Sequence, residues 1–199
     1  MSWRRARVAA SAGIVAATAV VARTQQVSVL EARIFRSVNR RSDRICAPVW
    51  VVMQSGALPA VFLVALVVDQ RGLHRRSVSI LIGGIALWLG VKVAKIPVGR
   101  GRPRCHLDDV RVRGPDQSGL GYPSGHAAIA TMLALCATQP GPSRCAALGV
   151  AGGTALARLY VGAHLPLDVV GGAAIGALAA DVVAAARSNA SCPALSIAR

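Results

Sequence analysis

A succession of long uncharged segments most constrains how this chain can fold. The longest, Ile45–Val68, runs for 24 residues without a charge, enough for one helix to cross a hydrocarbon core of about 30 Å. Charged residues make up 16% of the chain and its mean hydropathy is +0.51, whereas soluble domains carry about 25% charged residues. The composition therefore excludes a disordered chain and a large soluble enzyme, and it predicts an integral membrane protein.

Five further apolar segments are predicted to be helices: Val8–Ala22, Ser77–Val91 (extended by Lys92, Ala94 and Lys95), Ala127–Thr138, Cys145–Val161 and Leu165–Ala186. The first follows Arg4, Arg5 and Arg7 and looks like a signal peptide, but more hydrophobic segments follow it, so we expect a membrane helix that stays attached. We therefore expect an all-α bundle of about six transmembrane helices, with Gly172 and Gly176 allowing close helix packing. Residues 1–199 would form a single domain, in which 45–199 are the core bundle.

Residues Val27–Val38 show a different pattern, with apolar and basic side chains on opposite faces of one helix. The apolar stripe comprises Val27, Leu30, Ile34 and Val38, and the basic face comprises Arg33, Arg36 and Arg40. This pattern predicts an amphipathic helix in the membrane interface, and a connecting helix packed on its neighbours is an equal alternative. Residues 1–44 would thus hold the first helix and this amphipathic helix.

The net charge of +15 admits nucleic acid, a membrane surface or an anionic substrate as a partner. Only 4% of the residues are aromatic and the arginines stand between apolar runs, which argues against nucleic acid. The five cysteines show no metal-binding spacing. Cys46 and Cys105 could face the same side of the membrane, which leaves a disulfide between them open.

Ionisable residues collect at the long polar loop, residues 96–122, and at the helix ends beside it. Lys95 ends the third expected helix, His126 starts the fourth, Arg158 ends the fifth, and His164 and Asp168 start the sixth. Because successive spans alternate in direction, all of these positions fall on the same side of the membrane. The loop itself adds further cations, among them Arg100, Arg102 and Arg104.

The chemistry of this group points to phosphate. Three cations together suit a multiply charged anion, and here they would be Lys95, Arg102 and Arg158. Ser124 is a good N-cap and Gly125 lets backbone approach closely, so the start of that helix adds N–H donors for the same anion.

A histidine and an aspartate four residues apart predict an oriented base or nucleophile. Asp168 would hold one imidazole nitrogen of His164 and make the other more nucleophilic. His126 would then be free to act as an acid. A lone histidine in a helix turn is more often structural, and the joint spacing is what favours chemistry.

Three segments together resemble the signature of the type 2 phosphatidic acid phosphatase family. They are KIPVGRGRP (Lys95–Pro103), PSGH (Pro123–His126) and ARLYVGAHLPLD (Ala157–Asp168). The corresponding three parts of the family pattern are K-x6-RP, PSGH and SR-x5-H-x3-D. That superfamily also includes bacterial acid phosphatases, glucose-6-phosphatase and vanadium haloperoxidases. The chain departs from the pattern at Ala157, where the family has serine, and the lost hydroxyl should tune the site by about 0.5–1.5 kcal/mol.

The resemblance implies a mechanism without metal or cofactor. His164 would attack phosphorus to form a phosphohistidine, Asp168 would orient it, and His126 would protonate the leaving oxygen before water hydrolyses the intermediate. The phosphoryl oxygens would be held by Lys95, Arg102, Ser124, Gly125 and Arg158.

These observations predict a membrane lipid phosphatase with a lipid phosphate substrate. The dominance of arginine over lysine suggests a GC-rich bacterial genome and favours a polyprenyl diphosphate or another polyprenyl-linked cell-envelope intermediate. Phosphatidate and phosphatidylglycerophosphate are competing substrates, a phosphotransferase is an alternative reaction, and a non-catalytic protein that binds anionic lipids is a distant alternative. We expect a multi-pass protein of the plasma membrane with the site outside the cytoplasm, although the bundle would invert if Val8–Ala22 did not span.

Overall fold

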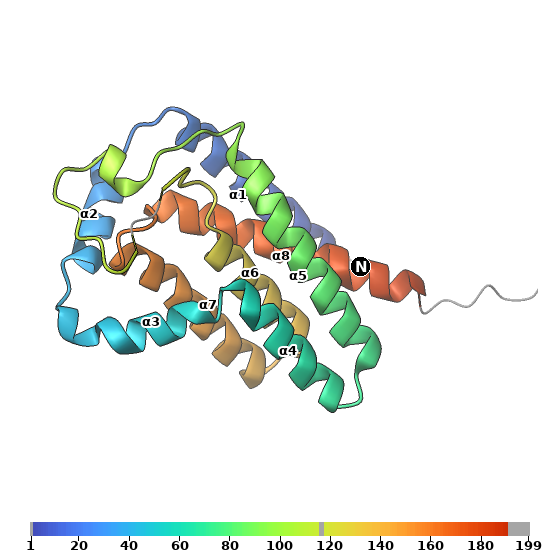
Figure 1. The fold of residues 1–199 in the computed structure, drawn as a ribbon. Helices are drawn as coiled ribbons and strands as arrows, with labels where there is room; N and C mark the ends of the chain where they lie inside the picture. The colour runs from blue at the N-terminus through green and yellow to red at the C-terminus, as the bar shows by residue number, and fades with distance from the viewer. Residues whose placement is uncertain (1, 116–117, 191–199) are drawn as a thin grey trace, which may run out of the picture.

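The computed structural model describes residues 2–115 and 118–190, and every regular element in those ranges is helical (Figure 1). The expected all-α bundle is confirmed. The elements are α1 (Ser2–Arg23), α2 (Val29–Asn39), the 3₁₀ turn η1 (Asp43–Ile45), α3 (Cys46–Gln54), α4 (Leu58–Gln70), α5 (His74–Lys95), the 3₁₀ turn η2 (Pro103–Cys105), α6 (Gly125–Ala137), α7 (Pro142–Tyr160) and α8 (Pro166–Ala190).

Helices α6 and α8 form the centre of the bundle. Helix α1 packs along α8, α4 pairs with α5, and α3 lies on α7 (Figure 1). Close packing at the centre needs small residues, because a Cβ atom at Gly172 would collide with the carbonyl of Ser124 and one at Gly176 with that of Ala128. The predicted close-packing role of these two glycines is confirmed.

The longest uncharged segment is not one helix, contrary to the sequence prediction. It is divided between α3 and α4, and the two halves, Asp43–Gln54 and Leu58–Gln70, are bent by 58°. Gly56 stands at the break, where a Cβ atom would collide with the backbone carbonyl of His126. Pro59 then occupies the first turn of α4, a position that proline favours. The break brings residues 56–58 against the start of α6.

Fewer described helices are long and apolar enough to cross a membrane than the six expected. Three meet that test by length and composition, namely Arg4–Arg23, His74–Lys95 and Pro166–Ser188, and the bent pair would make a fourth. Helix α6, at 13 residues, is apolar but shorter. Helix α7, at 19 residues, is long enough but is not among the helices that are also sufficiently apolar.

Helix α2 packs on the bundle through a face that the sequence pattern did not predict. Its buried residues are Glu31, Ala32, Phe35 and Asn39, whereas Leu30 and Ile34 of the predicted stripe stay exposed. The Asn39 side chain donates hydrogen bonds to the carbonyls of Arg111, Leu159 and Tyr160. The helix is thus a packed connection, as in the alternative, that also leaves an apolar stripe outside.

Two details concern the segments around the long loop. The Cys46 and Cys105 thiols are free, so the disulfide considered from the sequence does not form.

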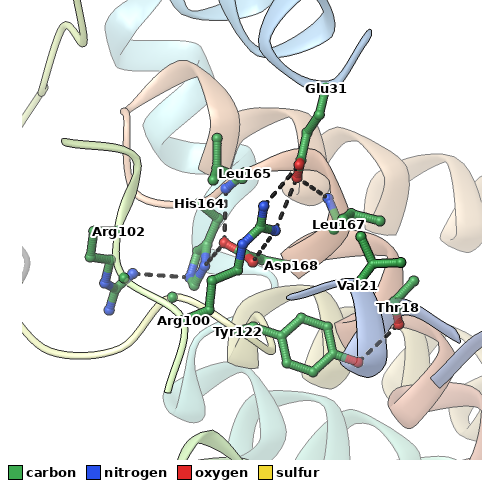
Figure 2. Close-up of polar contacts among 12 residues, drawn as sticks. Thr18, Val21, Glu31, Arg100, Arg102, Tyr122, His164, Leu165, Leu167 and Asp168 are labelled. Carbon is green, nitrogen blue, oxygen red and sulfur yellow. Dashed lines mark hydrogen bonds and ion pairs between the residues drawn. The ribbon is translucent and has the colours of Figure 1, made fainter. Parts of the chain in front are cut away.

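The hydroxyl of Tyr122, at the end of the loop, lies 2.9 Å from Thr18 Oγ1 of α1 (Figure 2). This contact ties α1 to the loop beside the start of α6.

Candidate active site

A cavity of about 230 Å³ opens where the loop meets the ends of α5, α6 and α7. Six of the eight predicted site residues line it: Lys95, Arg102, Gly125, His126, Arg158 and His164. The other two, Ser124 and Asp168, have no exposed surface. The structure therefore brings the predicted residues around one space, as the alternation of helices suggested.

The imidazole of His164 lies between a carboxylate and a guanidinium (Figure 2). Its Nδ1 is 3.5 Å from Asp168 Oδ2, and its Nε2 is 3.2 Å from Nη1 of Arg102. A guanidinium can only donate, so Nε2 accepts and the ring hydrogen belongs on Nδ1, beside the carboxylate. The same Oδ2 accepts a hydrogen bond from the backbone N–H of Leu165 at 2.9 Å. This arrangement leaves the nucleophilic lone pair on Nε2.

The surroundings of His164 keep its ring neutral. Burial lowers the pKa of His164 well below its ordinary value, and the positive charges of Arg158, Arg102 and Lys95 lower it further. A neutral imidazole keeps the lone pair that nucleophilic attack requires.

Three cations around the cavity are fixed by contacts with the protein. Lys95 Nζ donates to the carbonyls of Leu120 at 2.8 Å and Gly121 at 3.1 Å. Arg102 Nη1 donates to the carbonyl of Ala163 at 2.7 Å, and Arg158 Nη1 donates to Met53 Sδ at 3.2 Å. A guanidinium carries five N–H donors, so Arg102 keeps further donors for a phosphoryl group. The three cations are therefore prepositioned, which reduces the ordering that binding requires.

The start of α6 forms another wall of the cavity. Ser124 is its N-cap, as predicted, and Ser124 Oγ accepts from the N–H of Ala127 at 3.5 Å. A Cβ atom at Gly125 would make only an ordinary contact with Val91. Protein packing therefore does not demand glycine there, and its position at the cavity wall suits a close approach by a ligand.

More than half of the chain matches a known protein family. The model of the PAP2 superfamily matches residues 76–191, a range that contains all eight predicted site residues. The chain belongs to the PAP2 superfamily. None of the curated proteins matches the sequence.

Two solved structures share this PAP2 fold. One is LpxE of Aquifex aeolicus, which is 21% identical in sequence and superposes with a TM-score of 0.67. The match covers 79% of this chain and 96% of the LpxE chain. The other is the first transmembrane PAP2 type phosphatidylglycerolphosphate phosphatase from Bacillus subtilis. It is 18% identical in sequence and superposes with a TM-score of 0.71. The match covers 95% of this chain and 98% of the Bacillus subtilis chain.

A buried charge network behind this PAP2 site was missed by the sequence reasoning. The Arg100 side chain has no exposed surface, and it bridges Glu31 of α2 and Asp168 of α8 (Figure 2). Its Nη1 lies 3.0 Å from Glu31 Oε1 and 3.2 Å from Asp168 Oδ1, and its Nη2 lies 2.8 Å from Glu31 Oε2. Glu31 Oε1 also accepts from the N–H of Leu167 at 3.0 Å.

One sequence signal could have found this network. Glu31, Phe35 and Asn39 are spaced four residues apart and share the buried face of α2. A single acidic residue on that face, in a segment rich in arginine, indicates a buried partner. The predicted apolar stripe is displaced from this buried face by one residue, which is about 100° around the helix.

The donor set of the site does not resemble a metal centre. Within residues 2–115 and 118–190, no group of three or more His, Cys, Asp or Glu side chains could hold a metal ion. Cations, instead of carboxylates, line the cavity.

The buried network predicts that Glu31 positions the catalytic pair without contacting the substrate. Removing one member of a buried ion-pair network costs about 3–5 kcal/mol of folding stability, so Glu31→Gln should lower the unfolding temperature. Because Glu31 helps to hold Arg100 and the first turn of α8 in place, the variant should also lower kcat at least tenfold while KM changes little. The matched control is Asp109→Asn, because Asp109 pairs at the surface with Arg36 and Arg40 of the same helix. Steady-state kinetics and thermal unfolding of both variants test this, and wild-type kcat in folded Glu31→Gln would contradict it.

Proposed function

We propose that the protein is an integral membrane lipid phosphatase that works through a phosphohistidine at His164. The family assignment makes it a phosphoric ester hydrolase. The observation that carries the proposal is the position of the His164 imidazole, whose Nε2 lies 3.2 Å from Arg102 Nη1 at a cavity ringed by cations. Binding an anionic lipid would need the cations but no nucleophile held beside Asp168, and this disfavours a non-catalytic role.

The first chemical step would transfer the phosphoryl group to the protein. His164 Nε2 forms a bond with phosphorus as the bond from phosphorus to the leaving oxygen breaks. His126, which lines the same cavity, donates a proton to that oxygen. Burial, together with the charges of Arg158, Arg102 and Lys95, lowers the pKa of His126 to about 3 in the free protein, so His126 takes up this proton from solvent when the negatively charged phosphate binds beside it. The guanidinium of Arg102 would move from Nε2 to a phosphoryl oxygen when the substrate binds.

The second step would regenerate the histidine. Water attacks phosphorus, His126 accepts a proton from it, the Nε2–phosphorus bond breaks, and inorganic phosphate leaves. Asp168 stabilises the positive charge that the imidazole carries in the intermediate. No step uses position 157, and Ala157 is buried against Met53 and Tyr160.

The surroundings of the cavity support a lipid as the substrate. Apolar residues line part of its wall, among them Leu58, Trp88 and Ile129. Beyond the cavity, helix α4 exposes Phe62, Leu63 and Leu66, and α5 exposes Leu89 and Val93. An acyl or prenyl chain could lie on such a surface while its phosphate reaches the cations.

A further cation at the same cavity favours a head group with two negative centres. Lys92 Nζ lies 3.4 Å from the centroid of the Trp88 ring, and both residues line the cavity. This ammonium is additional to the family motif and suits a second phosphate.

We therefore propose a polyprenyl diphosphate, or a related polyprenyl-linked intermediate, as the substrate. Phosphatidylglycerophosphate also has two phosphate groups and is the specific alternative, which the Bacillus subtilis structure favours. Phosphatidate is a weaker alternative because it has one.

The catalytic proposal is tested by phosphate release from a panel of these lipids. Purified wild type should hydrolyse a polyprenyl diphosphate best and stay active in EDTA. His164→Ala should abolish release, and His126→Ala should lower it by about 10²–10⁴-fold. Asp168→Asn should be milder than His164→Ala, because the nucleophile remains. Substantial turnover by a folded His164→Ala variant would overturn the nucleophile assignment, and preference for phosphatidylglycerophosphate would select the alternative substrate.

We further propose that the site faces outside the cytoplasm of a bacterial plasma membrane. Support comes from α1, whose residues Arg4–Arg23 are long and apolar enough to span. A spanning α1 puts its basic N-terminus at the end opposite the site, in agreement with the positive-inside rule. The arginines of α2 argue the other way, but Arg36 and Arg40 pair with Asp109.

A cysteine at position 118 tests this orientation. Ser118 is exposed in the loop beside the site, so Ser118→Cys in an active variant without other cysteines gives a single reporter. In intact cells, a membrane-impermeant maleimide should modify it without permeabilisation. Protection until the membrane is permeabilised would show that the bundle is inverted.

A further inference from the structure

We propose that a second phosphate-binding cavity lies at the end of the bundle opposite the active site. This cavity, of about 400 Å³, is lined by four half-buried arginines from four different helices: Arg7 of α1, Arg76 of α5, Arg144 of α7 and Arg187 of α8. None of them belongs to the PAP2 motifs or contributes to the hydrolysis proposed above. We call this space the arginine cavity.

The length of helix α5 gives the distance between the arginine cavity and the active site. Arg76 and Lys95 stand 19 residues apart on this helix, which at about 1.5 Å per residue separates them by roughly 28 Å. That length is close to the thickness of a hydrocarbon core, about 30 Å. The N-terminus of α1 and the C-terminal part of α8 lie at the same end as the arginine cavity (Figure 1). The cavity is therefore level with the head groups of the leaflet opposite the active site.

Two of the arginines are fixed by the end of α6. Arg76 Nε donates to the carbonyl of Cys136 at 2.6 Å and its Nη2 to that of Thr138 at 2.9 Å. Arg144 Nη2 donates to the same Thr138 carbonyl at 2.7 Å. These contacts use only part of the five N–H donors of each guanidinium, and they hold the groups in place before a ligand arrives.

Arginines dominate the lining of the arginine cavity. The carboxylate of Asp181 accepts from Arg7 Nε at 3.1 Å and also pairs with Arg4. The C-terminus of α6 supplies about half a negative charge more, and no described residue that lines the cavity is acidic. Arg76, Arg144 and Arg187 line the same space, so their like charges repel one another. An anion in the cavity would remove this repulsion.

The chemistry of the lining selects phosphate. Guanidinium groups bind phosphate oxygens in pairs, with geometry that a lysine cannot reproduce. A neighbouring groove of about 820 Å³ shares Arg76 and Arg187 with the cavity and is partly apolar, with Leu73 and Val78 in its lining. The shared ligand chemistry is therefore a phosphate group, either in the head group of an anionic phospholipid whose chain follows this groove or as free phosphate.

The test compares phospholipid binding by wild type and by Arg144→Gln/Arg187→Gln in the full chain purified in neutral detergent. Native mass spectrometry gives the affinity for phosphatidylglycerol, with phosphatidylcholine as the zwitterionic reference. The control is Arg5→Gln/Arg71→Gln, which makes the same change of charge at two exposed residues outside both the arginine cavity and the neighbouring groove. The active site is intact in every variant, so its contribution to binding is common to all of them.

We expect the affinity for phosphatidylglycerol to fall at least about tenfold in the cavity variant, because charge-assisted hydrogen bonds are lost, and to stay near wild type in the control. Equal affinities in the cavity variant and the control would overturn the proposal. If the double variant does not fold, Arg187→Gln alone gives the same comparison against Arg71→Gln. Displacement of the variant-sensitive lipid by inorganic phosphate would identify free phosphate as a ligand, and a lack of displacement would identify the lipid as the source.

Discussion

The fully buried guanidinium of Arg100 is the interaction on which the active-site end of the protein depends. It links three segments that are distant in sequence: the long loop, α2 through Glu31, and α8 through Asp168. Without it, two buried carboxylates would repel each other, and burying unpaired charges is costly. The same network holds the first turn of α8 through the N–H of Leu167, and it thereby places Asp168 beside His164.

The PAP2 site combines two electrostatic environments within a few residues. Behind His164, two carboxylates and Arg100 form a closed, buried network. In front of it, cations surround the cavity. Burial lowers the pKa of the imidazole most, and these positive charges lower it further, so the ring is neutral. A phosphoryl group that binds these cations would meet a lone pair already directed at the cavity. This separation allows one histidine to be both neutral before attack and stabilised by a carboxylate afterwards.

Much of this arrangement could be predicted from the sequence, because apolar runs define helices and alternating helices bring their ends together. The gathering of Lys95, His126 and His164 followed from that alternation. The bend between α3 and α4 could not be predicted, since the carbonyl of His126, 70 residues away, creates the need for Gly56. The Glu31–Arg100 pair was missed for the same reason, because its members come from separate segments and meet only in the folded bundle.

The central claim, that His164 carries the phosphoryl group, is tested most directly by trapping the intermediate. Wild-type protein would be mixed with a lipid labelled with ³²P in its terminal phosphate and quenched with alkali within one turnover. The account predicts label that is stable to alkali, labile to acid and located by peptide mapping on His164. It also predicts no label in the His164→Ala variant. Label on another residue, or single-turnover hydrolysis with no labelled protein at any time, would contradict the account.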